Sequence, residues 1–247
     1  MTMAYPSQIS YPRLFAEGTA IVISILLAFA IEAWWDDRQD RVEEQEILLA
    51  LEAEFEFNLS RIDYILNYRN TTLASITRMF EAAAGQRILT PAELDKLLGD
   101  LAWSASVEFS TGALNNLIQG GKLRLIENDE LVQILAGLPG LFEAVARTET
   151  SEIDTLKQNV MPFFFKNAFV PQISNTLTGQ PGTGDNAPLD VIPLAQEFDH
   201  TSLLKNTEFL NVMTLKQWDQ YDALWICGKV QIEFERAVEL IGAEIDK

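Results

Sequence analysis

The pattern of hydrophobic and polar positions begins with an apolar segment in which Glu32 is the only charged residue between Glu17 and Asp36. At ~1.5 Å of rise per residue, this segment spans roughly 27 Å as an α-helix, close to the ~30 Å hydrocarbon core of a bilayer. We therefore predict one transmembrane helix over residues 14–35. It is preceded by an N-terminal tail, residues 1–13.

The C-terminal edge of this helix has the composition of a membrane interface. Trp34 and Trp35 stand where aromatic side chains meet lipid headgroups, and charged residues follow from Asp36 onward. Glu32 lies close enough to this edge to extend its carboxylate toward water, and Arg38 carries the first positive charge beyond it. We predict that Glu32, Trp34, Trp35 and Arg38 anchor the helix. A functional carboxylate inside the membrane is the alternative for Glu32.

Two other interpretations of the apolar segment are open. The sequence AFA at residues 28–30 has the small-x-small form of a signal cleavage site, and long apolar helices also occur in soluble cores. The region before it carries Arg13, offset by Glu17, which is weak for a secretory signal. The aromatic and then charged edge disfavours a soluble core helix. The pattern favours an uncleaved membrane anchor.

The same helix is expected to continue beyond the membrane, because no Gly or Pro occurs between Gly18 and Gly85. Residues 36–45 are mostly polar, which is typical of a solvated stalk, and Val42 is the aliphatic residue among them. Beyond the stalk, an apolar stripe recurs mostly at three- and four-residue steps: Leu48, Leu51, Phe55, Leu59, Ile62, Leu66, Leu73, Ile76 and Phe80. This stripe requires a partner, either the core of the same chain or an intersubunit coiled coil.

Two short helices are predicted next. Thr90, Pro91 and Glu93 form a capping box with proline at the first helical position, so a helix begins there and runs to about Trp103. A second short helix starts near Thr111.

A helical hairpin follows. Gly120 and Gly121 supply a left-handed stop, and Asn128 caps the next helix. A DNA-binding helix-turn-helix is disfavoured because the segment offers only Lys122 and Arg124 as cations. We predict that this hairpin serves packing.

The last third of the chain alternates helix and loop. Gly137, Pro139 and Gly140 predict a break, followed by a helix over about residues 141–168 with a kink near Pro162. Residues 170–201 are rich in Pro and Gly, as in a long surface loop.

A long C-terminal helix completes the chain within residues 202–247, beginning at Asn206 or Thr207. Its apolar stripe comprises Tyr221, Leu224, Cys227, Val230, Phe234, Val238, Ile241 and Ile245. The predicted fold is all-α. An N-terminal transmembrane helix continues into a long stalk helix and an antiparallel helical bundle with a short-helix hairpin, and residues 36–169 form the stalk and most of the bundle.

Charge and composition exclude several classes of function. The formal net charge of -18 repels a phosphate backbone, so we expect no nucleic-acid partner. The single cysteine, Cys227, rules out an intramolecular disulfide and a multi-cysteine zinc site. The only histidine, His200, follows Glu197 at the i, i+3 spacing of half a di-iron site, but no second such pair exists. We predict an ordinary surface histidine.

Acidic and aromatic residues give two weaker candidates for binding. A divalent cation is one interpretation of the glutamates at positions 43, 44, 46, 52, 54 and 56, but neighbouring helix positions point to different faces and favour a solvated acidic surface. Trp218 and Trp225 lie two turns apart on one helix face; core or edge packing is favoured over a ligand-binding wall. We assign no catalytic, cofactor-binding or metal-binding residue.

Two segments, read together, resemble a known family. The segment EGTAIVISILLAFAIEAWWDDRQDR, followed by EEQEILLALEAEFEFN, and the hairpin GALNNLIQGGKLRLIENDELVQIL are similar to an uncharacterised family of bacterial single-span membrane proteins, a domain of unknown function. The segment LLKNTEFLNVM is similar to the family's ending. The resemblance implies a helical extramembrane domain at the bacterial inner membrane, and no catalytic residues.

The predicted function is that of a non-catalytic, membrane-anchored interaction or scaffolding protein. Its partners are the lipid bilayer and either its own copies or another membrane protein. Ser24 and Ala28 form a small-x-x-x-small pair that permits close helix approach, and with Val42 they are the candidate self-association positions. The short tail with Arg13 favours a cytoplasmic N-terminus, which places the helical domain outside the cytoplasm. A ligand-sensing domain that signals through a partner is the alternative.

Overall fold

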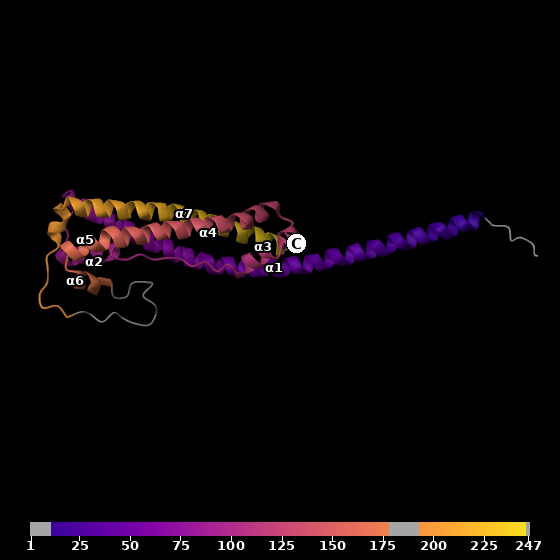
Figure 1. Cartoon of the computed structure of the whole chain (residues 1–247), viewed down its shortest axis with the longest axis horizontal. Helices are drawn as coiled ribbons and strands as arrows, with labels where there is room; N and C mark the ends of the chain where they lie inside the picture. The colour runs from indigo at the N-terminus through magenta and orange to yellow at the C-terminus, as the bar shows by residue number, and fades with distance from the viewer. Residues whose placement is uncertain (1–10, 178–192, 246–247) are drawn as a thin grey trace, which may run out of the picture.

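The computed structural model describes residues 11–177 and 193–245 (Figure 1). Within these ranges the chain is all-helical and has no strand, which confirms the predicted fold class at this level. The glycine-rich part of the predicted loop, residues 179–185, and most of the tail lie outside the described residues.

Helix α1, Tyr11–Ala83, is one unbroken helix of 73 residues. Its first half projects from the rest of the molecule as a single exposed helix, and its second half packs within the helical body, as we call the packed part of the molecule (Figure 1). The helix ends where Gly85 takes a left-handed φ of 74°. The Gln86 N–H then donates to the Glu81 carbonyl (2.8 Å) and the Gly85 N–H to the Ala82 carbonyl (3.0 Å), which together form a Schellman motif.

The two predicted short helices are present. Helix α2, Pro91–Leu101, begins with the predicted capping box, in which the Thr90 hydroxyl accepts from the Glu93 N–H and the Glu93 carboxylate accepts from the Thr90 N–H. Helix α3, Gly112–Gln119, leads into a 3₁₀ turn at Lys122–Leu125. Gly121 supplies the left-handed conformation between them, with φ 66°, whereas Gly120 is right-handed.

Helix α4, Asp129–Thr155, is longer than predicted. Asn128 caps it as expected, accepting from the Leu131 N–H. The predicted break at residues 137–140 is wrong, because α4 runs straight through Pro139. An interior proline costs ~3 kcal/mol or more. The leucines around it, at 131, 135 and 138, are fully buried, so packing offsets that cost.

A π-helical turn, Leu156–Val160, follows α4 and precedes α5, Met161–Asn167. The wider turn lies just before Pro162, where the sequence predicts a kink. The predicted loop over 170–201 is partly helical: it contains α6, Val170–Ser174, and a 3₁₀ turn at Asn175–Leu177.

The C-terminal helix α7, Thr207–Ile245, comes after a 3₁₀ turn at Thr201–Lys205. The Asn206 side chain accepts from the Phe209 N–H, so Asn206 caps this helix as predicted. The C-terminal end of α7 lies at the end of the helical body from which α1 projects (Figure 1).

Helix α7 packs against both α1 and α4 (Figure 1). Two apolar cores form: one among α1, α4 and α7, and a second among α1, α2, α5 and α7. In the core nearer to the projecting helix, Phe55 of α1 packs on Phe234 of α7 with ring centroids 5.1 Å apart. In the second core, Phe163 of α5 stacks on Phe209 of α7 at 5.7 Å. The apolar stripe of α1 beyond residue 47 contributes to both cores. It therefore packs inside its own chain, the first of the two alternatives for that stripe.

Candidate interaction surfaces

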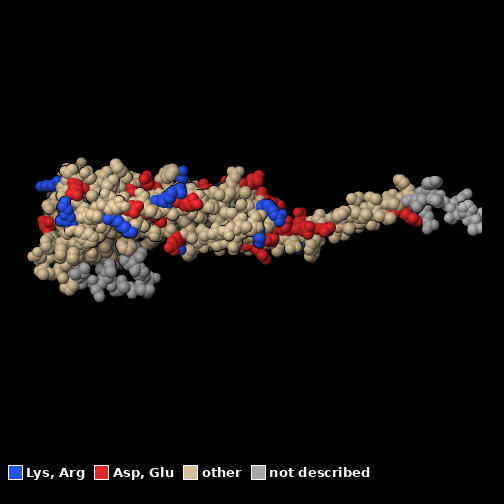
Figure 2. Space-filling view, viewed as in Figure 1, with Lys and Arg blue, Asp and Glu red and all other residues tan. Residues whose placement is uncertain are grey.

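The projecting half of α1 carries the predicted membrane anchor. Its apolar segment is long enough to cross a membrane and none of it is buried in the molecule. Trp34 and Trp35 are about 60% exposed, and Glu32 and Arg38 are also exposed. The four predicted anchors thus stand on consecutive turns where the apolar surface gives way to an acidic collar (Figure 2).

A second segment, Asp129–Asn167, also passes a length and composition test for a membrane span. Part of that segment is buried, and its leucines at 131, 135 and 138 are enclosed by the helical body. These contacts are those of a core helix. Of the two candidate spans, the projecting half of α1 is the one whose apolar side chains pack against no other part of the described chain.

The helical body begins at an ion-pair clamp on α1. Arg41 bonds to Glu44 at 2.9 Å and to Glu127 at 2.6 Å, and these hydrogen bonds raise the pKa of its guanidinium. Glu44 also accepts from the Glu127 N–H at 3.1 Å. The predicted solvated stalk, 36–45, is therefore shorter than expected, because Glu44 is buried.

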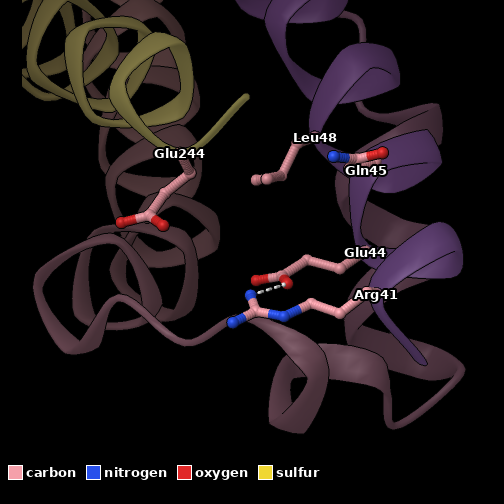
Figure 3. A pocket seen from close by; sticks show the side chains of 5 residues that line it. All are labelled: Arg41, Glu44, Gln45, Leu48 and Glu244. Carbon is pink, nitrogen blue, oxygen red and sulfur yellow. Dashed lines mark hydrogen bonds and ion pairs between the residues drawn. The ribbon is translucent and has the colours of Figure 1, made fainter. Parts of the chain in front are cut away.

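This clamp forms one wall of a pocket of about 250 Å³ (Figure 3). Arg41, Glu44, Gln45 and Leu48 come from α1, and Glu244 faces them from the end of α7 (Figure 3). Glu244 also accepts a hydrogen bond from the Asn128 side chain. The pocket marks the point where α1 becomes joined to both α4 and α7.

A buried ionic layer lies between the two cores. Glu152 of α4 is fully buried and accepts from Arg69 (2.7 Å), Lys216 (2.7 Å) and Gln220 (2.9 Å). Burial raises the pKa of Glu152, but Lys216 and Arg69 outweigh this and hold it below its usual range. Glu149, 3.6 Å from Arg69, has its pKa raised by burial.

Several buried polar atoms around this layer have no hydrogen-bond partner, among them Arg69 Nε, Gln220 Oε1 and Trp103 Nε1. The Trp103 carbonyl, in contrast, accepts from Lys216 at 3.1 Å. An unpartnered buried group costs ~1–3 kcal/mol, so this layer is an unusual feature of the helical body.

Helix α7 turns aromatic side chains outward. Trp218 and Trp225 are 60% and 63% exposed, so neither lies in a core, and packing at the bundle edge stays a prediction. Tyr221, predicted to belong to the buried stripe, is also exposed. Lys229 Nζ lies 3.8 Å from the centre of the Trp225 ring. The spacing of apolar residues shows which of them share a face of the helix, but it does not show which face the neighbouring helices cover.

His200 is not the surface residue that its sequence context predicts. It is 4% exposed, and its Nδ1 lies 2.6 Å from Asp95 Oδ1. Its Nε2 accepts from the Phe169 N–H at 2.9 Å, which places the ring proton on Nδ1. Both nitrogens are occupied, and Gln172 bonds to Asp95 at 2.6 Å. The group ties α6 to α2.

The acidic residues predicted as a solvated surface have mixed roles. Glu43 pairs with Lys122 at 2.7 Å, but Glu54 is buried. The Glu54 carboxylate accepts from the Ala113 and Leu114 N–H groups at the N-terminus of α3. Its burial corrects the prediction, because a carboxylate satisfies the free amides of a helix start. In the described ranges no three His, Cys, Asp or Glu side chains are grouped to hold a metal ion.

The candidate self-association positions lie on the exposed side of α1. Ser24, Ala28 and Val42 are all exposed, and the Ser24 hydroxyl donates to the Ala20 carbonyl at 2.8 Å. No known protein family, curated protein or solved structure matches this chain.

Proposed function

We propose that this chain is a non-catalytic, membrane-anchored interaction or scaffolding protein. It acts through helix–helix contacts with its own copies or with another membrane protein. In this proposal α1, α4 and α7 form an antiparallel bundle that the anchor holds at the lipid surface. We also propose that the chain is related to the bacterial single-span membrane proteins that its sequence resembles.

The continuity of α1 carries this proposal. One helix supplies both the exposed apolar segment and a core helix of the helical body, without a break between them. The clamp of Arg41 on Glu44 and Glu127 starts only six residues after Trp35. A joint of this kind leaves little freedom between membrane and body, which suits a protein that presents a surface at a fixed height.

The proposed location is the bacterial inner membrane, with one span and the helical body outside the cytoplasm. The formal net charge of -18 supports the absence of a nucleic-acid partner. The anchor residues Glu32, Trp34, Trp35 and Arg38 stand at the proposed lipid interface.

Membrane fractionation tests the anchor. The full chain should stay in the membrane pellet after alkaline carbonate extraction, and a variant lacking residues 1–35 should be released. A full chain that carbonate extracts completely contradicts the proposal. So does a mature protein whose first residue is Ile31, which would identify the segment as a cleaved signal.

A ligand-sensing domain is the second candidate, and the buried ionic layer favours it. Gln220 Oε1 and Trp103 Nε1 offer an acceptor and a donor that no protein group satisfies. Native mass spectrometry of gently extracted protein tests this. A small molecule that stays bound to the wild type and is lost from a Gln220→Leu variant would support sensing.

A further inference from the structure

The outward face of α1 in the helical body carries apolar side chains that the described chain covers only in part. The Arg61 guanidinium lies 5.5 Å from the centre of the Phe57 ring, and no neighbouring helix of the described chain packs on this face. Val42, Leu49 and Phe57 are 52%, 54% and 52% exposed, and Tyr64 is 41% exposed. At 3.6 residues per turn, these positions fall within an arc of about 80°. The small residue Ala53 is exposed on the same arc. The buried positions of α1 lie on the opposite side.

The same arc continues into the apolar half of α1. Ser24 lies 18 residues before Val42, which corresponds to five helical turns, and Ala28 follows one turn later. Ala20 precedes Ser24 by four residues. Since the Ser24 hydroxyl donates to the Ala20 carbonyl, this stretch presents a shallow surface with no unpaired hydroxyl proton.

The spacing of these residues gives both halves the same handedness of pairing. Val42, Ala53 and Tyr64 are eleven residues apart, a repeat of 3.67 residues per turn that produces right-handed helix pairs. Small residues four apart in a membrane helix also favour a right-handed crossing. Both patterns therefore favour a right-handed crossing of the two helices.

We propose that this face, the outer seam (Ser24, Ala28, Val42, Leu49, Phe57 and Tyr64), joins two copies of this chain as a parallel dimer. The inference rests on the proposed function, because it requires that α1 is anchored in a membrane. From Ser24 to Tyr64 the seam is roughly 60 Å long.

A second copy is the occupant that matches both halves. The partner must supply a helix that presents small residues inside the bilayer and that continues into water with an apolar face. Lipid alone leaves Leu49, Phe57 and Tyr64 in water, and a soluble partner leaves Ser24 and Ala28 unmatched. A second α1 supplies both in the same order, and two-fold symmetry is the commonest arrangement of identical chains.

The seam also carries a charge that opposes pairing. Glu46 is exposed one turn after Val42 and faces its own symmetry mate in a parallel dimer. Salt screens such a repulsion over a Debye length of ~10 Å at 0.1 M. The dimer should therefore tighten as salt rises, and Glu46→Gln should remove most of that salt dependence. Glu235→Gln, on the exposed side of α7, is the matched control.

Cysteine cross-linking in native membranes tests the seam directly. In a full-length Cys227→Ala background, Val42→Cys, Leu49→Cys and Tyr64→Cys should each form disulfide dimers on mild oxidation. Trp218→Cys and Ile232→Cys, on the outward face of α7, should not. Cross-links that form at the α7 positions and not on α1 would overturn the proposal and place the contact on the other exposed face.

A second measurement does not depend on cysteines. Leu49→Glu should lower the dimer fraction of nanodisc-embedded protein by about tenfold or more, because two apolar side chains leave the contact. Trp225→Glu should not change it, and both variants should keep the wild-type circular dichroism. A chain that remains in membranes but is monomeric at every protein-to-lipid ratio contradicts the seam alone. A chain that does not stay in membranes contradicts the proposed function itself.

Discussion

Removing the carboxylate of Glu152 should destabilise the helical body severely. This residue accepts from Arg69, Lys216 and Gln220, and the side chains of all three donors are fully buried. A Glu152→Gln change leaves two buried cations without the carboxylate that bonds to both, although Glu149 lies 3.6 Å from Arg69. Breaking a buried ion pair from one side typically costs ~3–5 kcal/mol. That loss is at least a fifth of the ~5–15 kcal/mol by which most domains are stable.

Urea unfolding of the full chain in detergent micelles, followed by circular dichroism, measures this loss. Glu143→Gln is the matched control, because Glu143 is exposed and its 3.6 Å pair with Arg147 lies on the surface. Replacing Arg69, Glu152 and Lys216 together with methionine should recover at least half of the lost stability, since no uncompensated charge remains. A Glu152→Gln variant that is within about 1 kcal/mol of wild type would refute the reasoning that this layer holds the helices together.

Three further predictions concern the same helical body. Because the pKa of Glu152 is lowered, its contribution to stability is present above the ordinary glutamate pKa of 4.5 and is lost as the pH falls below that value. The Glu152→Gln variant should therefore lose less stability than the wild type when the pH is lowered. His200→Ala should leave Asp95 Oδ1 and the Phe169 N–H without a partner, which lowers the free energy of unfolding by about 2–4 kcal/mol. Hydrogen exchange at the Phe169 amide should accelerate, and unchanged protection of that amide would contradict the assigned hydrogen bond. Gly85→Ala should cost ~1–2 kcal/mol through its left-handed φ alone, since no atom beyond the adjoining residues lies within 4 Å of the added methyl. An unchanged melting temperature would argue against that conformation.

Features with a local cause were predicted well from the sequence. The capping box at Thr90 and Glu93 and the cap at Asn128 involve residues three apart, so their hydrogen bonds follow from the chain's own geometry. The long α1 follows from the absence of Gly and Pro after Gly18. The caps identify where these helices begin, because their hydrogen bonds need no distant partner.

Features that depend on distant partners were not predicted. Arg69 and Glu152 are 83 residues apart, and His200 and Asp95 are 105 apart, so no spacing pattern connects them. The helix through Pro139 reflects burial of the leucines around it, which overrides a local breaker. Trp218 and Trp225 share one face, but only the positions of α1 and α4 decide that this face is outward.

The central claim is that the first half of α1 lies in a lipid bilayer and continues into the helical body. The direct measurement is a spin-label scan of single cysteines from Phe15 to Gln45 in reconstituted vesicles, in the Cys227→Ala background. Labels through Trp34 should be accessible to oxygen and shielded from a water-soluble nickel reagent, and this preference should reverse beyond Asp36. Labels at Val22 and Leu26 that the nickel reagent reaches as readily as a label at Asp40 would contradict the claim.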